Sequence, residues 1–313
     1  MNILVTGAGG FIGSHLCEHL LIDPRNTVIG LDDFVREELK TIGTRNIALL
    51  LGHPRFRLIK ANMLSTDWLS ILQHVDAVYH LAGIPGVRAS WGSDFKHYVG
   101  SNIMATQQLL EACRMVKIRT FVYASTSSVY GEQKGKVSED ASLTPLSPYG
   151  VSKLTGEYLC HVYRKNYQVP VIILRYFTVY GPRQRSDMAF HRFIKQLLAS
   201  QPVTLIGDGS QTRDFTYVSD CASATASVLG RSDLVGETIN IGGKERASIS
   251  KVIETLETIA GLKADIVKAG EMHGEPMHTW ADISKAQRLL GYSPKVGLTE
   301  GLQRQLQHFS EFI

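Results

Sequence analysis

The sequence predicts an α/β protein whose main part is a doubly wound parallel sheet, followed by a smaller C-terminal α/β domain. In the first half of the chain, short apolar runs alternate with helical stretches. Near-continuous apolar strands separated by helices are typical of a parallel sheet covered on both faces. The pattern changes after the polar segment "YGPRQRSDM" at 180–188, beyond which the elements are shorter. A second domain is therefore expected after this loop.

The elements follow one another in a regular order. Six apolar runs are the candidate strands of the main sheet, at 2–6, 27–31, 56–60, 76–81, 119–124 and 170–175. Helices are expected between them, near 11–22, 37–51, 66–73, 95–116 and 149–167. The run at 203–210 reads as a further strand that ends in a turn. We predict one domain at 1–178, a second at 179–313, and a return of the chain to the main sheet near 214–242.

Composition describes an ordinary globular chain that is long enough to bury a full core. Of 313 residues, 44% are apolar and 20% are charged, and the net charge of +4 is too small to indicate nucleic-acid or polybasic membrane binding. No apolar run reaches transmembrane length, and "MNILVTGAGG" begins a strand at once, which predicts a cytoplasmic protein without a signal peptide. No metal site is predicted. Reduced thiols are expected at the four scattered cysteines, Cys17, Cys113, Cys160 and Cys221.

A glycine-rich turn follows the first strand. The stretch "VTGAGGFIG" at 5–13 places Gly7, Gly10 and Gly13 between a strand and a helix. Glycines permit the tight turn and a close approach of the backbone to a pyrophosphate, which the helix N-terminus stabilises. Asp32 follows the second strand and stands about 20 positions after Gly13. A carboxylate at this place binds ribose hydroxyls and repels a 2′-phosphate. The spacing therefore predicts a Rossmann domain that binds NAD rather than NADP.

The predicted cofactor contacts extend beyond this turn. Asp33, next to Asp32, is given only a minor role. The set is completed by Phe11, Ile12, Asn62, Met63, Leu81, Ala82, Tyr149, Lys153 and Tyr176.

A tyrosine and a lysine stand one helical turn apart. In "SPYGVSK" at 147–153, Tyr149 and Lys153 share one face of a helix that Pro148 opens at its first position. A phenol with an ordinary pKa near 10 is a poor base at neutral pH. An adjacent ammonium and a positive nicotinamide ring both favour the phenolate. Tyr149 is the predicted catalytic base.

Four consecutive hydroxyls follow the buried run "TFVYA" at 120–124. They occupy 125–128 of "ASTSSVYG", and no carboxylate stands among them. A hydroxyl cluster at the end of a buried strand is costly unless it is hydrogen-bonded. A ligand at this strand end is therefore expected.

These motifs resemble the extended short-chain dehydrogenase/reductase family of nucleotide-sugar enzymes. The resemblance covers nearly the whole chain and also includes "HLAG" at 80–83, "LRYFTVYGPRQRSDM" at 174–188, "RDFTYVSD" at 213–220 and "NIGG" at 240–243. It implies that Tyr149 is the base, that Lys153 binds the nicotinamide ribose and that Thr126 bonds the sugar oxygen being oxidised. It also implies that Arg213 binds the diphosphate, and that the two domains bind NAD and the nucleotide sugar respectively.

The residues after Thr126 narrow the chemistry that the resemblance implies. Family dehydratases carry Asp-Glu at the next two positions, and UDP-glucuronate decarboxylases carry Glu at the second. Here both positions, Ser127 and Ser128, are serine. The acidic groups needed for elimination or decarboxylation are absent, so epimerisation at C4 is the expected outcome.

Thr178 and the segment from Arg185 to Met188 are similar to those of the UDP-glucuronate 4-epimerase subgroup, which usually has proline where this chain has Ser186. The hydroxyls would bind the sugar carboxylate, and UDP-glucuronate and UDP-galacturonate are the expected substrates. UDP-glucose/UDP-galactose 4-epimerase, UDP-glucuronate decarboxylase and an NAD-binding regulatory protein remain alternatives. By analogy, helices 95–116 and 149–167 would form a homodimer. The predicted substrate set is Arg88, Thr126, Ser127, Ser128, Thr178, Arg185, Met188 and Arg213, while His273, near the place where relatives carry an arginine, is given low weight.

Overall fold

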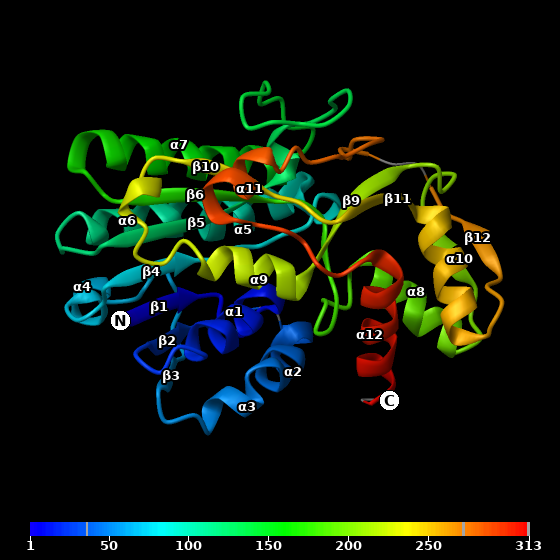
Figure 1. Ribbon diagram of the computed structural model, residues 1–313, viewed down its shortest axis with the longest axis horizontal. Helices are drawn as coiled ribbons and strands as arrows, with labels where there is room; N and C mark the ends of the chain where they lie inside the picture. The colour runs from blue at the N-terminus through cyan, green and yellow to red at the C-terminus, as the bar shows by residue number, and fades with distance from the viewer. Residues whose placement is uncertain (36, 271–272, 312–313) are drawn as a thin grey trace.

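A seven-stranded parallel sheet forms the centre of the computed structural model, which describes residues 1–35, 37–270 and 273–311 (Figure 1). The strand order is β10-β6-β5-β4-β1-β2-β3. The chain adds β2 and β3 on one side of β1 and then crosses to add β4 and the later strands on the other side, as in a doubly wound sheet. The predicted fold class is confirmed. The strands are β1 (Asn2–Thr6), β2 (Thr27–Leu31), β3 (Phe56–Ile59), β4 (Ala77–His80), β5 (Thr120–Thr126), β6 (Val171–Tyr176) and β10 (Thr238–Ile241).

Helices cover both faces of the sheet because its strands are apolar on both sides. On one face, α1 (Phe11–Leu21), α9 (Val218–Ala226) and α11 (Ser284–Leu290) contribute to a single buried cluster with the strands. On the other, α4 (Trp68–Leu72), α6 (Ala105–Cys113) and α7 (Pro148–Tyr167) form a second cluster. β10 pairs with β6, so the chain returns to the large sheet within 214–242.

Two expected helices differ from the prediction. The helix expected at 37–51 is two helices, α2 (Glu37–Asn46) and α3 (Ala48–Leu51), since the backbone of Ile47 between them is not helical. The helix expected at 95–116 comprises α5 (Phe95–Tyr98), a π-helical segment at Val99–Met104, and α6. The run at 203–210, expected to be a strand that ends in a turn, forms β8 (Val203–Leu205) followed by a glycine-containing turn, as predicted.

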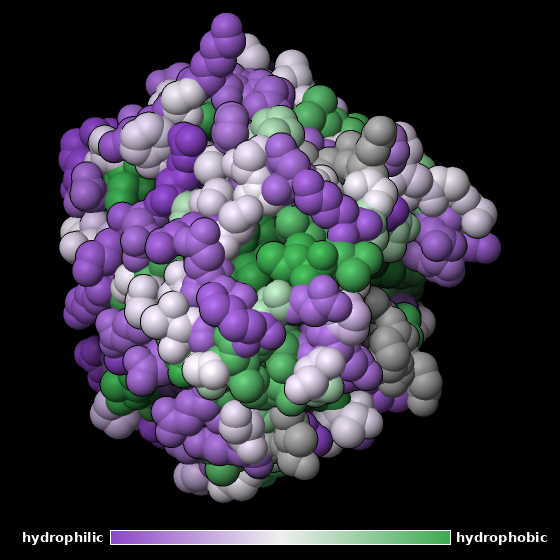
Figure 2. Space-filling model, turned by 90° about the vertical axis from the view of Figure 1, so that its right-hand side faces the viewer, coloured by the Kyte–Doolittle hydropathy of each residue, from purple (hydrophilic) through white to green (hydrophobic). Residues whose placement is uncertain are grey.

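The smaller part lies to the right in Figure 1 and holds its own aromatic core. Its surface, turned toward the viewer in Figure 2, is mostly hydrophilic around an apolar area near the middle. Tyr180, Phe190 and Phe215 pack ring against ring inside it. Its elements are β7 (Val179–Tyr180), β8, β9 (Thr212–Tyr217), β11 (Glu245–Ser248), β12 (Ile266–Lys268), α8 (Ala189–Leu198), α10 (Ile249–Ala260) and α12 (Leu298–Ser310).

Two further findings concern the cysteines and the possibility of a membrane-spanning helix. The four cysteines are buried, each with a free thiol. Among the described residues, no helix combines the length and apolarity that crossing a bilayer would need.

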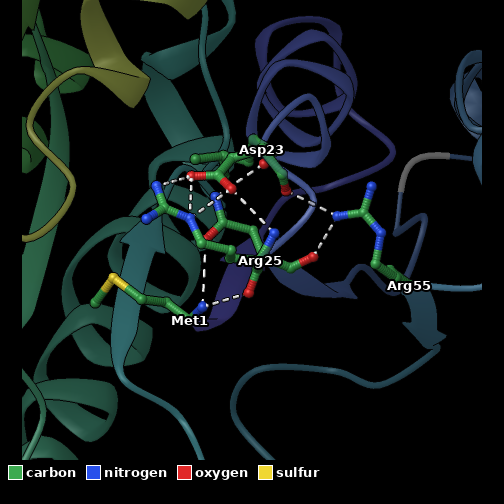
Figure 3. Close-up of polar contacts among 6 residues, drawn as sticks. Met1, Asp23, Arg25 and Arg55 are labelled. Carbon is green, nitrogen blue, oxygen red and sulfur yellow. Dashed lines mark hydrogen bonds and ion pairs between the residues drawn. The ribbon is translucent and has the colours of Figure 1, made fainter.

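An arginine fastens the end of α1 to the edge of the sheet. The Arg55 guanidinium donates to the carbonyl oxygens of Asp23 at 2.8 Å and Asn26 at 2.7 Å, and to that of Leu21, the last residue of α1, at 2.8 Å. Figure 3 shows Arg55 pointing toward the turn that contains Asp23 and Arg25. The turn is also held by a salt bridge of 2.7 Å between Arg25 and Asp23. A cation at the carbonyl end of a helix satisfies acceptors that the helix leaves open.

Replacing Arg55 by alanine is expected to lower the free energy of unfolding by about 2 kcal/mol, because hydrogen bonds to a charged donor are worth about 1.5–3 kcal/mol each and the freed carbonyls are partly rehydrated. Urea denaturation measures the change. Arg57→Ala, at an exposed position of β3, is the matched control and should stay within about 0.5 kcal/mol of wild type. An equal loss in both variants would contradict the role of the three carbonyl contacts.

Candidate active site

The glycine turn between β1 and α1 has no room for side chains. Gly7 has a φ of 73°, in the left-handed region, and its N–H donates to the carbonyl of Leu31 at 2.8 Å. A Cβ on Gly13 would collide with the carbonyl oxygen of Gly7, and a Cβ on Gly7 would meet the backbone of Ala82. The backbone thus forms a narrow cradle at the N-terminus of α1, where helix N–H groups stabilise anions.

Asp32 is tied to this cradle by the backbone. Its two carboxylate oxygens accept the N–H groups of Gly9 and Phe34, each at 2.9 Å. Burial raises the pKa of Asp32, while these two bonds oppose the rise. Beside it, the carboxylate of Asp33 accepts the Asn62 side-chain amide at 2.7 Å. The two acidic residues predicted at the end of β2 are therefore held at the mouth of the glycine turn.

One cavity of about 310 Å³, at the lower end of the size range of small-molecule sites, lies along the carboxyl ends of the strands. Every residue of the predicted cofactor set lines it, from Gly7 at the glycine turn to Lys153 on α7. A glycine cradle, a helix N-terminus and a carboxylate within one cavity fit a dinucleotide. The lining residues of that set are Gly7, Gly10, Phe11, Ile12, Gly13, Asp32, Asp33, Asn62, Met63, Leu81, Ala82, Tyr149, Lys153 and Tyr176.

Tyr149 and Lys153 reach this cavity from the first two turns of α7. Ser147 caps the helix by accepting the Gly150 N–H at 3.1 Å, and Pro148 occupies its first turn. Lys153 is buried, with Nζ 4.1 Å from the ring centroid of Tyr123, and burial lowers its pKa to about 8. Burial thus makes Lys153 easier to deprotonate than an exposed lysine.

The surroundings of Tyr149 act on its pKa in opposite directions. Burial raises the pKa, while a hydrogen bond with Thr126 and the charge of Arg185 lower it. Burial outweighs these polar contributions, so the pKa of Tyr149 in the protein alone lies above that of a free phenol. Arg185, which supplies a cationic contribution, lines the same cavity.

The hydroxyl cluster lies at the end of β5. Thr126 is buried, and its Oγ1 accepts the Ser128 N–H and donates to the Ser128 hydroxyl, both at 3.2 Å. Ser127 and Ser128 are half-buried in a 3₁₀ turn. Thr126 pairs in register with Tyr176 of β6, so Thr178 leaves the sheet at the same edge. The two segments that carry the four predicted hydroxyls are thus neighbours.

The loop before α8 carries two further predicted residues. Arg185 makes a two-point ion pair with Asp187, with both N–O distances 2.9 Å. Met188 is half-buried at the N-terminal boundary of α8, while Phe190, two residues on, belongs to the core of the smaller part. Of these, Arg185 reaches the cavity wall beside Tyr149.

Arg88 and Arg213 meet at one carboxylate. Glu275 lies 3.1 Å from each guanidinium, although the two arginines are far apart in sequence. Arg213 is the more buried, and burial lowers its pKa. Arg88 and His273 also line a second cavity of about 560 Å³, together with Trp91, Ile206, Ala269 and Gly270. The structure therefore brings Arg88 and Arg213, both predicted substrate residues, together beside this second cavity.

Several cavity residues were missed by sequence reasoning. Ser101 and Asn102 lie in the π-helical segment, and buried Asn102 accepts the Ile84 N–H at 2.7 Å and donates to the Ser152 hydroxyl at 2.9 Å. Nothing local in the sequence marks a π turn. Ser125 also lines the cavity and donates to the buried carboxylate of Glu157. The sequence signal for this contact was Glu157, an acidic residue two turns after Tyr149 on a helix face that is otherwise buried.

Comparisons with known proteins agree with this geometry. The chain matches the model of the "NAD dependent epimerase/dehydratase family" over residues 3–242. It is 55% identical to UDP-glucuronic acid 4-epimerase from Bacillus cereus, whose crystal structure contains UDP-glucuronic acid and NAD, with a TM-score of 0.98 and 100% of both chains covered.

Two curated relatives match over nearly their whole lengths. A Bacillus subtilis protein described as an uncharacterized UDP-glucose epimerase, YtcB, is 57% identical over 310 residues, with 99% of this chain and 98% of that protein covered. The UDP-glucuronate 4-epimerase of Thermodesulfobacterium geofontis is 38% identical over 315 residues, with 99% and 96% covered. The resemblance and the NAD cofactor expected from the sequence are confirmed: the chain belongs to the NAD-dependent epimerase/dehydratase family.

Proposed function

We propose that this protein is an NAD-dependent epimerase that interconverts UDP-glucuronate and UDP-galacturonate by inverting C4 of the sugar. One observation carries the proposal. Tyr149 and Lys153 reach the cavity next to Thr126, and the turn that follows Thr126 offers serine hydroxyls and no carboxylate. The similarity to proteins named UDP-glucuronate 4-epimerases supports the choice of sugar.

Proton transfer in this site involves Tyr149 and Thr126. Tyr149, as phenolate, accepts the proton of the 4-hydroxyl and later returns it to the same oxygen. Thr126, which is hydrogen-bonded to Tyr149, holds that oxygen. The glycine cradle and Asp32 hold NAD, which supplies a hydride acceptor and a positively charged ring that favours the phenolate. Inversion requires only that the 4-keto sugar presents its other face before it is reduced.

The remaining hydroxyls would bind the sugar carboxylate. Oxidation at C4 of a glucuronate produces a β-keto acid, which loses CO₂ readily when the carboxylate bond stands perpendicular to the carbonyl plane. Thr126, Ser127, Ser128 and Thr178 would hold the carboxylate away from that orientation, since each presents a donor at the same edge of the sheet. Arg185 would add positive charge.

The nucleotide would lie between the two domains proposed here, at 1–178 for NAD and 179–313 for the nucleotide sugar. Arg88 and Arg213 would bind the diphosphate, and both already face the one carboxylate of Glu275. Met188 would contact the uracil. The four buried thiols support residence in a reducing compartment such as the cytoplasm.

A homodimer is part of the proposal. About half of each side chain is exposed at Met104, next to the start of α6, and at Val151, Tyr158 and Val162 along α7. Since large apolar side chains gathered on adjacent helices favour association, we infer that these helices pack against their counterparts in a second copy.

The function is tested by incubating the purified protein with UDP-glucuronate and with UDP-glucose separately and identifying the products by NMR. UDP-galacturonate should form, without net NADH, because the hydride returns to the same sugar. Conversion of UDP-glucose alone would favour the neutral-sugar epimerase, and stoichiometric accumulation of NADH would indicate a dehydrogenase.

A further inference from the structure

A buried ion pair lies behind the catalytic residues. Glu157 of α7 and Arg175 of β6 are 1% and 3% exposed, and their side chains meet at two points, Nε to Oε1 at 2.9 Å and Nη2 to Oε2 at 2.6 Å. Arg175 also donates to the Tyr130 hydroxyl at 2.9 Å. Breaking such a pair by removing one charge is strongly destabilising, whereas replacing both charges by apolar groups often is not.

Glu157 also holds the strand that carries the reactive hydroxyls. Its Oε1 accepts the hydroxyl of Ser125, which lines the cavity and directly precedes Thr126. Ser125 and Arg175 are paired in register on neighbouring strands. One carboxylate on α7 therefore joins the ends of β5 and β6 to the helix that carries Tyr149.

The same carboxylate stands one helical turn beyond Lys153. On α7 itself, Tyr149 and Cys160 lie on the same helix face as the lysine. The negative charge of Glu157 acts to keep the ammonium charged, whereas burial raises the pKa of Cys160 and so keeps that thiol neutral. Tyr123 faces it from β5 at 4.1 Å. His80 of β4 lies close enough for the charge of Lys153 to contribute to lowering its pKa. Burial opposes the ammonium, and Glu157 is the carboxylate that counters this effect.

We propose that Glu157 is a positioning residue of the epimerisation reaction, which holds the hydroxyl-bearing end of β5 against α7 and places a carboxylate one helical turn from Lys153. The inference rests on the proposed function. Glu157 touches neither sugar nor cofactor in this scheme; it acts through Ser125 and Lys153. A protonated Lys153 one helical turn from Tyr149 favours its phenolate, so a variant in which Lys153 loses its proton at a lower pH should also lose activity at a lower pH.

Glu157→Gln tests this role because it keeps the shape and removes the charge. The pKa of Lys153, lowered by burial to about 8, should fall further, because the variant removes a carboxylate that favours the ammonium. We expect the high-pH limb of the kcat/KM profile to move down by about half a pH unit or more, with kcat reduced and the KM for the sugar little changed. Glu157→Asp should restore part of the shift. Glu254→Gln, at an exposed site on α10, should leave the profile unchanged.

A second variant covers the case in which Glu157→Gln does not fold. Glu157→Leu/Arg175→Met removes both buried charges and should fold. The limb should again move down, but by less than in Glu157→Gln, because the double variant also removes the positive charge of Arg175. A high-pH limb that stays in place in a folded variant of either kind would overturn the proposal, even if kcat falls.

The test also separates this inference from the proposed function. The pKa of Lys153 is read directly by NMR of protein labelled with ¹³C at the lysine ε-carbon, whether or not UDP-glucuronate is turned over. A lower pKa in the variant supports the electrostatic role of Glu157, and an unchanged one contradicts it. Absence of epimerisation in the wild-type protein would instead defeat the proposed function.

Discussion

Tyr149→Phe is expected to fold and to bind NAD but to lose about three orders of magnitude in epimerase kcat, because it removes the group that takes the proton from the sugar hydroxyl. The ring remains, so its edge contact with Tyr98, at 6.2 Å between centroids, should persist. Initial rates by NMR or a coupled assay measure the loss. Turnover within tenfold of wild type would refute Tyr149 as the base.

A matched control lies on the same helix. Tyr158 is 57% exposed on α7, and Tyr158→Phe also removes a single phenol oxygen. Because Tyr158 lies on the proposed dimer face, Tyr167→Phe, at a residue that is 49% exposed at the end of the same helix, is made as well; both variants should retain wild-type turnover. NAD content, measured by absorbance after release from the protein, should be alike in all three variants, so that a loss of activity in Tyr149→Phe cannot come from a loss of cofactor.

The Ser127→Ala/Ser128→Ala variant should release CO₂ from UDP-glucuronate. If the strand-end hydroxyls restrain the carboxylate, removing two of them weakens the restraint while oxidation at C4 continues. Each bond to a charged group is worth about 1.5–3 kcal/mol, so the ratio of UDP-4-keto-pentose or UDP-pentose to UDP-galacturonate should rise by roughly tenfold or more. NMR of the product mixture gives the ratio.

Ser142→Ala is the corresponding control, because Ser142 is an exposed serine on the loop that leads to α7. It should leave the product ratio as in wild type. A serine-pair variant that epimerises UDP-glucuronate with unchanged decarboxylation would show that these hydroxyls do not hold the carboxylate. If the enzyme acts on neutral sugars, neither variant should release CO₂.

Much of the fold could be predicted because its signals are local. Strand β1, the glycine turn and Asp32 are encoded within about 30 consecutive residues, as is usual for a dinucleotide-binding unit. The spacing of Tyr149 and Lys153 depends only on helical periodicity, which places residues four apart on one face. The interruption of the helix expected at 95–116 was harder to predict. Asn102, in its π-helical segment, makes hydrogen bonds with Ile84 and Ser152, which come from two other parts of the chain.

The sequence by itself determined the parallel sheet, the cofactor turn and the identity of the groups that can carry the chemistry. Only the tertiary structure decided the pKa values of these groups and the ion pairs around them. Burial raises the pKa of Tyr149 and lowers that of Lys153, and Glu157, Arg175 and Ser125 join across three elements. The physical reason is range: glycine conformation and helical spacing act between near neighbours in the chain, whereas desolvation and ion pairing depend on which distant segments fold against a residue.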